Sequence, residues 1–193
     1  PKNDFAYNNR ANAKSALGDK QGAITDYNRA IAINPQNAHA YNGRGNAKSA
    51  LGNKQGAIAD YDRAIAINPQ NSEAFFNRGL FKFNLADFQG AIADYSQAIT
   101  ISPKYFQAYA NRGVAKKNLG DKQGAIADYS RAIAINPKHD FAYINRGNLK
   151  FNLGDYQGAI ADYSKAIAIN PQQKASFYEY RGAAKFYLGD RQG

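Results

Sequence analysis

The 193-residue sequence contains no cysteine, methionine or tryptophan. Without cysteine the chain can form no disulfide, no thiolate metal ligand and no thiol nucleophile, and its redox compartment cannot be inferred. No apolar stretch approaches the roughly 20 residues of a membrane-spanning helix, and no signal peptide is visible. We therefore expect no membrane insertion, while the cellular location stays undetermined.

Residues suited to catalysis are also scarce. The two histidines, His39 and His139, lie far apart in the chain, and neither Ser15 nor Ser49 has a histidine nearby in the sequence. The aspartates recur at regular intervals and form no isolated acid/base pair. A glycine that appears once per interval marks a turn and does not make a phosphate-binding loop. We expect no enzymatic activity, no catalytic or metal-ligating residue and no cofactor.

The few prolines reveal the organisation of the chain, because they are spaced at a constant interval of 34 residues: Pro1, Pro35, Pro69, Pro103, Pro137 and Pro171. Between them Gly-Ala-Ile-x-Asp-Tyr returns, followed by Ala-Ile and by Ile-Asn-Pro or Ile-Ser-Pro. Such a period is typical of stacked units that bury their apolar faces only against their neighbours. No linker interrupts it, so we predict one domain, 1–193, with these repeats: 4–37, 38–71, 72–105, 106–139, 140–173 and a partial, capping repeat 174–193.

One period predicts two helices. Asp4 can cap a helix over about 5–17, and Gly18 suits a left-handed position after it. A second helix over about 20–33 carries its apolar residues at helical spacing and ends before Pro35. The alternation of a β-strand is absent, and alanine is abundant where β-branched residues would be expected. Each period is therefore predicted to be an antiparallel helical hairpin in an all-α protein.

The recurring residues resemble the tetratricopeptide repeat family. In the second repeat the matching positions are Tyr41, Gly45, Ala57, Tyr61 and Pro69. Arginine replaces the usual leucine before the glycine, and lysine replaces the usual tyrosine that follows it. The resemblance implies a right-handed α-solenoid, a superhelix of hairpins that acts as a protein-interaction scaffold, with its first helices lining a concave groove.

Residues that recur in every repeat are expected to hold the repeats together. The arginine series, Arg10 to Arg181, should pair with the aspartates of the second helices, although an arginine ladder for phosphate is the alternative. The lysine series, Lys14 to Lys185, is interpreted as a solvated or snorkelling face. The tyrosines of the second helices, such as Tyr61, are expected in the core.

Function is expected where the repeats differ on the groove face, which by resemblance also includes Asn8, His39 and Glu73. An asparagine series and an apolar patch stand out, and an amide that both donates and accepts can bracket a peptide bond. Two alternatives stay open: the amides bond neighbouring units, or the aromatics fill space between first helices. The candidate peptide-binding residues are Asn9, Asn12, Asn42, Asn46, Phe76, Asn77, Leu80, Phe83, Asn84, Gln107, Asn111, Val114, Lys117, Asn118, Ile144, Asn145, Asn148, Phe151, Asn152, Phe186 and Tyr187.

Some members of the family hold the C-terminal carboxylate of chaperones in a clamp of lysine, asparagine and arginine. The best register here supplies Asn42, Asn46, Asn77, Gln107 and Asn111. Both amides of the clamp are present, but its three cations are missing. Recognition of a C-terminal carboxylate is therefore not expected, although Lys117 could supply one charge nearby.

Charge suggests a different partner. The net charge is +10, and the fourth repeat carries six Lys or Arg residues against two Asp. Such a surface could bind nucleic acid or an acidic protein, although lysines on solvated faces are the simpler interpretation. Aromatics at base-stacking spacing are lacking, so binding of nucleic acid would have poor specificity, and we do not expect nucleic acid as the partner. End-to-end self-association is a third possibility, and the incomplete sixth repeat leads us to expect a segment of a longer protein.

Overall fold

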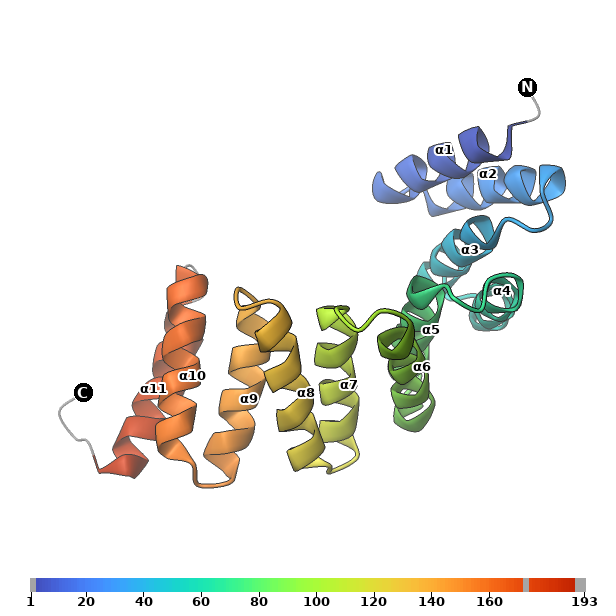
Figure 1. Cartoon of the computed structure of the whole chain (residues 1–193). Coiled ribbons are helices and arrows are strands. Elements are labelled where there is room, and N and C mark those ends of the chain that lie inside the picture. The colour runs from blue at the N-terminus through green and yellow to red at the C-terminus, as the bar shows by residue number, and fades with distance from the viewer. Residues whose placement is uncertain (1–2, 172–173, 190–193) are drawn as a thin grey trace. The chain divides into compact units, whose positions relative to one another are not determined.

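The structure, a computed structural model, describes residues 3–171 and 174–189, with side chains omitted for 174–177. The described residues form eleven helices and no strand (Figure 1). The predicted ends of the domain (1–2 and 190–193) and residues 172–173 of the fifth repeat lie outside the described part. The helices are α1 (Asp4–Ala16), α2 (Lys20–Ile33), α3 (Ala38–Ala50), α4 (Lys54–Ile67), α5 (Ser72–Asn84), α6 (Phe88–Ile101), α7 (Phe106–Asn118), α8 (Lys122–Ile135), α9 (Asp140–Asn152), α10 (Tyr156–Ile169) and α11 (Lys174–Leu188).

The helices pair as predicted, with each first helix packed against the second helix that follows it. The predicted all-α solenoid of helical hairpins is therefore confirmed. The bounds of the first hairpin agree within one residue, and Gly18 has the expected positive φ of 90°. The predicted cap was wrong: Asn3, not Asp4, accepts the Ala6 N–H at 3.1 Å. Asp4 instead accepts hydrogen bonds from the Asn34 and Asn37 amides.

The chain forms two compact units, residues 1–103 with α1–α6 and residues 104–193 with α7–α11. In the first unit, α1 contacts α3 and α3 contacts α5, so the first helices of successive hairpins are neighbours. In the second unit, α9 contacts α11 in the same way. That all repeats form one continuous domain stays a prediction. Among the described residues, no helix has both the length and the apolar character needed to cross a membrane.

Each second helix contributes an almost fully buried tyrosine, which confirms the expected core role: Tyr27, Tyr61, Tyr95, Tyr129 and Tyr163. In the second to fifth hairpins, the recurring glycine of the facing first helix makes room for the ring. A Cβ at Gly79 would lie 2.8 Å from Tyr95 Cε1, closer than atoms pack without displacement. The Gly–Tyr pair therefore sets how closely the two helices of a hairpin approach.

Five of the six arginines pair with the aspartates as predicted, namely Arg10, Arg44, Arg78, Arg112 and Arg146, whereas Arg181 pairs with no aspartate of the described residues. In the third repeat, Arg78 Nε and Nη2 donate to the two Asp94 oxygens at 2.9 and 2.6 Å, and Nη1 donates to Asp62 of the preceding hairpin at 2.6 Å. The guanidinium thus links two hairpins. Its donors are engaged within the protein, which does not support the alternative of a phosphate ladder.

The interpretation of the lysine series as a solvated face was wrong. Lys82 Nζ lies 2.9 Å from Asp94 Oδ2, so that one buried carboxylate holds both cations of its hairpin. Equivalent lysines make the same pair in the other hairpins: Lys14, Lys48, Lys116 and Lys150. A carboxylate deprived of water needs such compensation, and sequence periodicity alone does not reveal that two cations share it.

Candidate functional site

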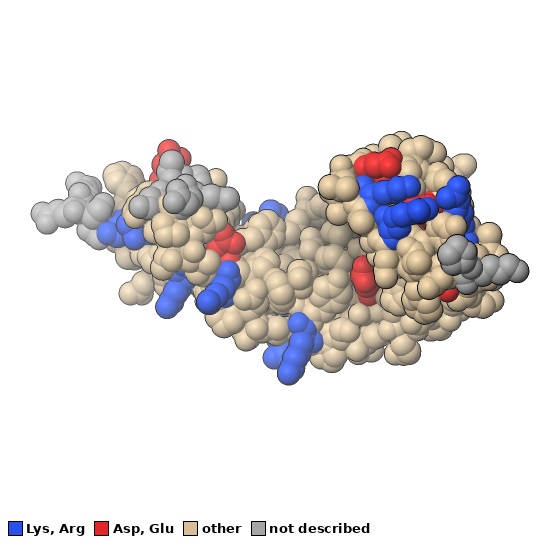
Figure 2. Space-filling view, turned by 90° about the horizontal axis from the view of Figure 1, so that it is seen from above, with Lys and Arg blue, Asp and Glu red and all other residues tan. Residues whose placement is uncertain are grey.

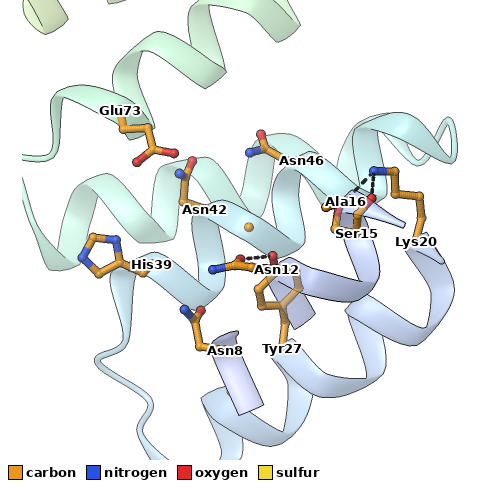
Figure 3. Close-up of a pocket in the computed structure, with 11 residues that line it drawn as sticks. Asn8, Asn12, Ser15, Ala16, Lys20, Tyr27, His39, Asn42, Asn46 and Glu73 are labelled. Carbon is orange, nitrogen blue, oxygen red and sulfur yellow. Dashed lines mark hydrogen bonds between the residues drawn. The ribbon is translucent and has the colours of Figure 1, made fainter. Parts of the chain in front are cut away.

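The first helices of the first unit enclose a cavity of about 400 Å³, called here the N-terminal cavity (Figure 3). Helices α1 and α3 contribute most of its lining, with Lys20 and Tyr27 added from α2 and Glu73 from α5. The lining consists of Asn8, Asn12, Ser15, Ala16, Lys20, Tyr27, His39, Asn42, Gly43, Asn46 and Glu73. It is therefore a largely polar concavity with four asparagine amides.

Buried tyrosines fix the orientation of two of these amides. Tyr27 Oη donates to Asn12 Oδ1 at 2.6 Å, and Tyr61 Oη donates to Asn46 Oδ1 at 2.8 Å. Within the described residues the Nδ2 groups of Asn12 and Asn46 make no hydrogen bond, so they are available to a ligand. Burial raises the pKa of Tyr27 to about 12, with a smaller contribution from the Glu73 carboxylate. The hydroxyl therefore stays protonated, and a donor, at neutral pH.

The hydrogen bond from a buried tyrosine to a first-helix asparagine recurs in the fifth repeat. Tyr163 Oη donates to Asn148 Oδ1 at 2.8 Å. The bond is absent in the third and fourth repeats. In these two repeats Leu80 and Val114 replace the asparagine, and the hydroxyls of Tyr95 and Tyr129 are buried without a hydrogen-bond partner. Asn12, Asn46 and Asn148 therefore accept a hydrogen bond from a buried tyrosine hydroxyl while their Nδ2 groups face outward.

Other predicted amides are engaged by the protein itself. Asn77 Nδ2 donates to the buried Asn42 Oδ1 at 3.1 Å, which joins α5 to α3. For this pair, the alternative that amides bond neighbouring units holds. Three more amides donate to the carbonyl oxygen four residues earlier in their own helix, at 2.8 to 2.9 Å: Asn111 to Gln107, Asn118 to Val114 and Asn145 to Phe141.

The predicted aromatic patch is partly used in packing. Phe83 is half-buried with its ring centroid 5.3 Å from that of Phe88, and Phe151 lies equally close to Tyr156. Each therefore packs on the second helix of its own hairpin. Phe186 and Tyr187 on α11 are more exposed, at 64% and 62% of their surface. Their place in a binding site stays a prediction.

Ten of the predicted residues line three described cavities. The N-terminal cavity has Asn12, Asn42 and Asn46; a cavity of about 230 Å³ between α3 and α5 has Asn46, Asn77, Leu80 and Asn84; and one of about 380 Å³ in the second unit has Lys117, Asn148, Phe151 and Asn152. The remaining predicted residues lie outside these cavities: Asn9, Phe76, Phe83, Gln107, Asn111, Val114, Asn118, Ile144, Asn145, Phe186 and Tyr187.

Sequence reasoning left two residues of the N-terminal cavity off the groove face. Lys20 and Tyr27 come from the second helix, which was not expected to reach it. It also placed Asn8, His39 and Glu73 on the face without including them in the candidate set. His39 and Glu73 differ from their equivalents in the later repeats, and Asn8 differs from those in repeats three to five, which is the signal that could have found them.

Family comparisons identify the repeats. A tetratricopeptide repeat model matches residues 38–71, 106–139 and 141–173. Further repeat models match 11–52 and 83–120, and 60–93. The chain belongs to the tetratricopeptide repeat family. Proteins of this family generally mediate protein–protein interaction. No curated protein matches the sequence.

Solved structures of tetratricopeptide repeat proteins show the same fold. MamA is 25% identical, with a TM-score of 0.75 over 86% of this chain and 96% of MamA. PilF of Pseudomonas aeruginosa is 17% identical, with a TM-score of 0.89 over 97% of this chain and 85% of PilF. YrrB, described as a TPR protein with an unusual peptide-binding site, is 22% identical, with a TM-score of 0.71 over 96% of this chain and 93% of YrrB.

Proposed function

We propose that this tetratricopeptide repeat protein binds a peptide segment of a partner protein on the face formed by its first helices. The observation that carries the proposal is the orientation of Asn12, Asn46 and Asn148, whose Oδ1 atoms are held by buried tyrosine hydroxyls. Their Nδ2 groups can donate to main-chain carbonyls of a ligand without reading its sequence. Because the donors are fixed before binding, little side-chain entropy is lost when they engage.

Apolar side chains at the same face would supply the rest of the affinity. Leu80 lines the cavity between α3 and α5, and Phe151 lines the cavity in the second unit beside Asn148 and Asn152. A lining that combines apolar groups with a few convergent polar ones is typical of ligand sites. The peptide-binding site named for YrrB belongs to that protein, and it is consistent with peptide binding by this fold.

The test is binding to a random peptide array at low and high salt, with Asn46→Asp as the variant. Aspartate keeps an acceptor for Tyr61 Oη, removes the outward donor and adds one negative charge, which the control variant adds as well. We expect a peptide consensus that survives high salt and binds the variant about tenfold more weakly, the loss of one good hydrogen bond. Asn28→Asp is the control, because Asn28 accepts from Arg44 outside these cavities and the equivalent residue Asp62 accepts from Arg78 in the same way.

Binding that vanishes at high salt and is equal in both variants would contradict the proposal and favour the basic surface of the fourth repeat. Two of its six cations, Arg112 and Lys116, already pair with Asp128. On the face seen in Figure 2, the Lys and Arg side chains form separate small groups on a largely uncharged surface. The cations of the fourth repeat outside this pairing are Lys117, Lys122, Arg131 and Lys138.

A further inference from the structure

Four residues of the N-terminal cavity depart from the repeat, and they meet at one place. Asn8 and Asn42 occupy a position that is apolar in the next three repeats, Gly43 replaces an asparagine of the other full repeats, and Glu73 is the acidic residue at a position otherwise without one in the five full repeats. Residues common to all repeats serve stacking. Residues that differ and still gather in one cavity point to a function of that cavity.

Gly43 keeps the cavity open. A Cβ at this position would lie 2.4 Å from Tyr27 Cζ and 2.5 Å from its hydroxyl oxygen. The asparagine found at this position in the other full repeats would therefore displace the Tyr27 ring or close the space above it. The loss of this side chain leaves room beside Asn42 and Asn12 for a ligand group.

The cavity has acceptors that lack donors. Glu73 forms no ion pair and no hydrogen bond with the described residues, and Figure 3 shows its carboxylate directed toward the side of the cavity where Asn42 lies. Asn8 is only 8% exposed, and its Oδ1 has no hydrogen-bond partner. A buried acceptor without a donor is costly, which applies to Asn8. Glu73 is exposed, so its solvated carboxylate is accessible to a ligand that donates.

The one lysine of the lining does not supply that donor. Lys20 Nζ donates to the Ser15 carbonyl oxygen at 2.5 Å and to Ser15 Oγ at 3.0 Å. Figure 3 shows Lys20 and Glu73 at opposite sides of the cavity. The negative charge of Glu73 is therefore uncompensated where it faces the amides.

We propose that the N-terminal cavity binds a lysine or arginine side chain of the partner segment, an inference that rests on the proposed peptide binding. The Glu73 carboxylate pairs with the cation, because charge-assisted hydrogen bonds are the strongest available here. Asn12 Nδ2 donates to a carbonyl of the same segment. The charge preference is opposite to that of a clamp for a C-terminal carboxylate.

The test uses acetylated and amidated tripeptides with one central residue between glycines, followed through the NMR signals of the asparagine side-chain amides. Arginine is compared with citrulline, which has the same shape without the charge, and lysine with Nε-acetyl-lysine. We expect the charged member of each pair to bind about tenfold more tightly or better. Glu73→Gln should abolish this preference. Glu179→Gln on α11, the other glutamate of the sequence, should leave it unchanged.

Equal binding of arginine and citrulline peptides, or an unchanged preference in Glu73→Gln, would overturn the inference. Equally tight binding of unacetylated triglycine amide would also overturn it, since the site would then take an α-amine. If the peptide array gives a consensus together with any of these three results, the proposed peptide binding still holds and only the cation site is refuted. An array without any consensus contradicts the groove proposal, whatever the tripeptides show.

Discussion

Two buried tyrosine hydroxyls in adjacent hairpins have different surroundings, although their rings are packed alike. Tyr61 Oη donates to Asn46, whereas Tyr95 Oη is buried without a partner because Leu80 replaces the asparagine. A buried polar group without a hydrogen bond costs free energy that a paired one does not. The same residue type therefore contributes differently to stability in neighbouring repeats.

We expect Tyr61→Phe to lower the free energy of unfolding by about 1 kcal/mol, the usual net value of one hydrogen bond. Tyr95→Phe should leave it unchanged or raise it slightly, because the mutation removes an unpaired hydroxyl. Urea denaturation of the two variants beside the wild type measures both effects. Equal losses in the two variants would show that the Tyr95 hydroxyl has a partner in solution.

The ion pairs of Asp26 make the stability of the first hairpin depend on pH. The hydrogen bond from Arg10 holds the pKa of Asp26 well below its usual range, opposed by burial and reinforced by Lys14. A carboxylate whose pKa is lower in the folded protein stabilises it above the unfolded pKa, near pH 4. This contribution is lost as the pH falls from there through the folded pKa.

Asp26→Asn should therefore be less stable than the wild type at pH 7. The difference in the free energy of unfolding should stay constant between pH 7 and 5 and shrink as the pH falls below about 4. Denaturant titrations of both proteins at a series of pH values give this difference directly. A difference that does not change with pH would show that the ion pair does not account for the stabilisation.

Among the helices, α11 occupies the first-helix position of the sixth repeat without the contact that the recurring glycine makes in repeats two to five. A Cβ at Gly147 of α9 would lie 2.8 Å from Tyr163 Cε1, whereas a Cβ at Gly182 of α11 meets nothing within 4 Å. In the first case an added Cβ would press on the Tyr163 ring in the present packing of α9 on α10. In the second case glycine only weakens the helix.

Alanine substitutions at these two glycines should therefore have opposite signs. Gly182→Ala should stabilise α11 by about 0.5–1 kcal/mol, because alanine has the higher helix propensity. Gly147→Ala should cost about 1–3 kcal/mol, since the Tyr163 ring must move. The melting temperatures of the two variants test this. A stabilising Gly147→Ala would show that the hairpin can widen without loss.

At the scale of the whole molecule, end-to-end association stays a prediction. Its support is the set of exposed apolar side chains on α11, including Phe186 and Leu188, together with the exposed Phe5 of α1 and Leu17, which follows α1. A head-to-tail contact would join α11 of one copy to α1 of another. Exposed aromatic surface of this kind tends to associate as concentration rises.

We expect sedimentation velocity to show a weight-average mass that increases with protein concentration. The double variant Phe186→Ser, Leu188→Ser should shift this increase to higher concentration, because it removes apolar area from α11. Asn28→Asp serves again as a control, because Asn28 is on α2 and belongs to neither of these helices. A constant monomer mass at all accessible concentrations would contradict the prediction.

The hairpins could be predicted almost completely from the sequence, and the site only in part. Helix ends, turns and the buried tyrosines follow from local rules: proline spacing, glycine at positive φ and apolar residues at helical intervals. The role of each asparagine did not follow, because an amide can bond a tyrosine, its own helix or a neighbouring helix. Asn46, Asn111 and Asn77 illustrate these three outcomes.

The sequence by itself determined the repeat, its helical hairpins and the Arg–Asp pairs, since these depend on residues close in the period or repeated in it. Only the tertiary structure decided that Asp94 also holds Lys82 and that Phe83 packs on Phe88. It likewise decided that Asn8, Gly43 and Glu73, from three different helices, line one cavity. The physical reason is that burial and unmet hydrogen bonds depend on which side chains meet in space, and a period states only which positions are equivalent.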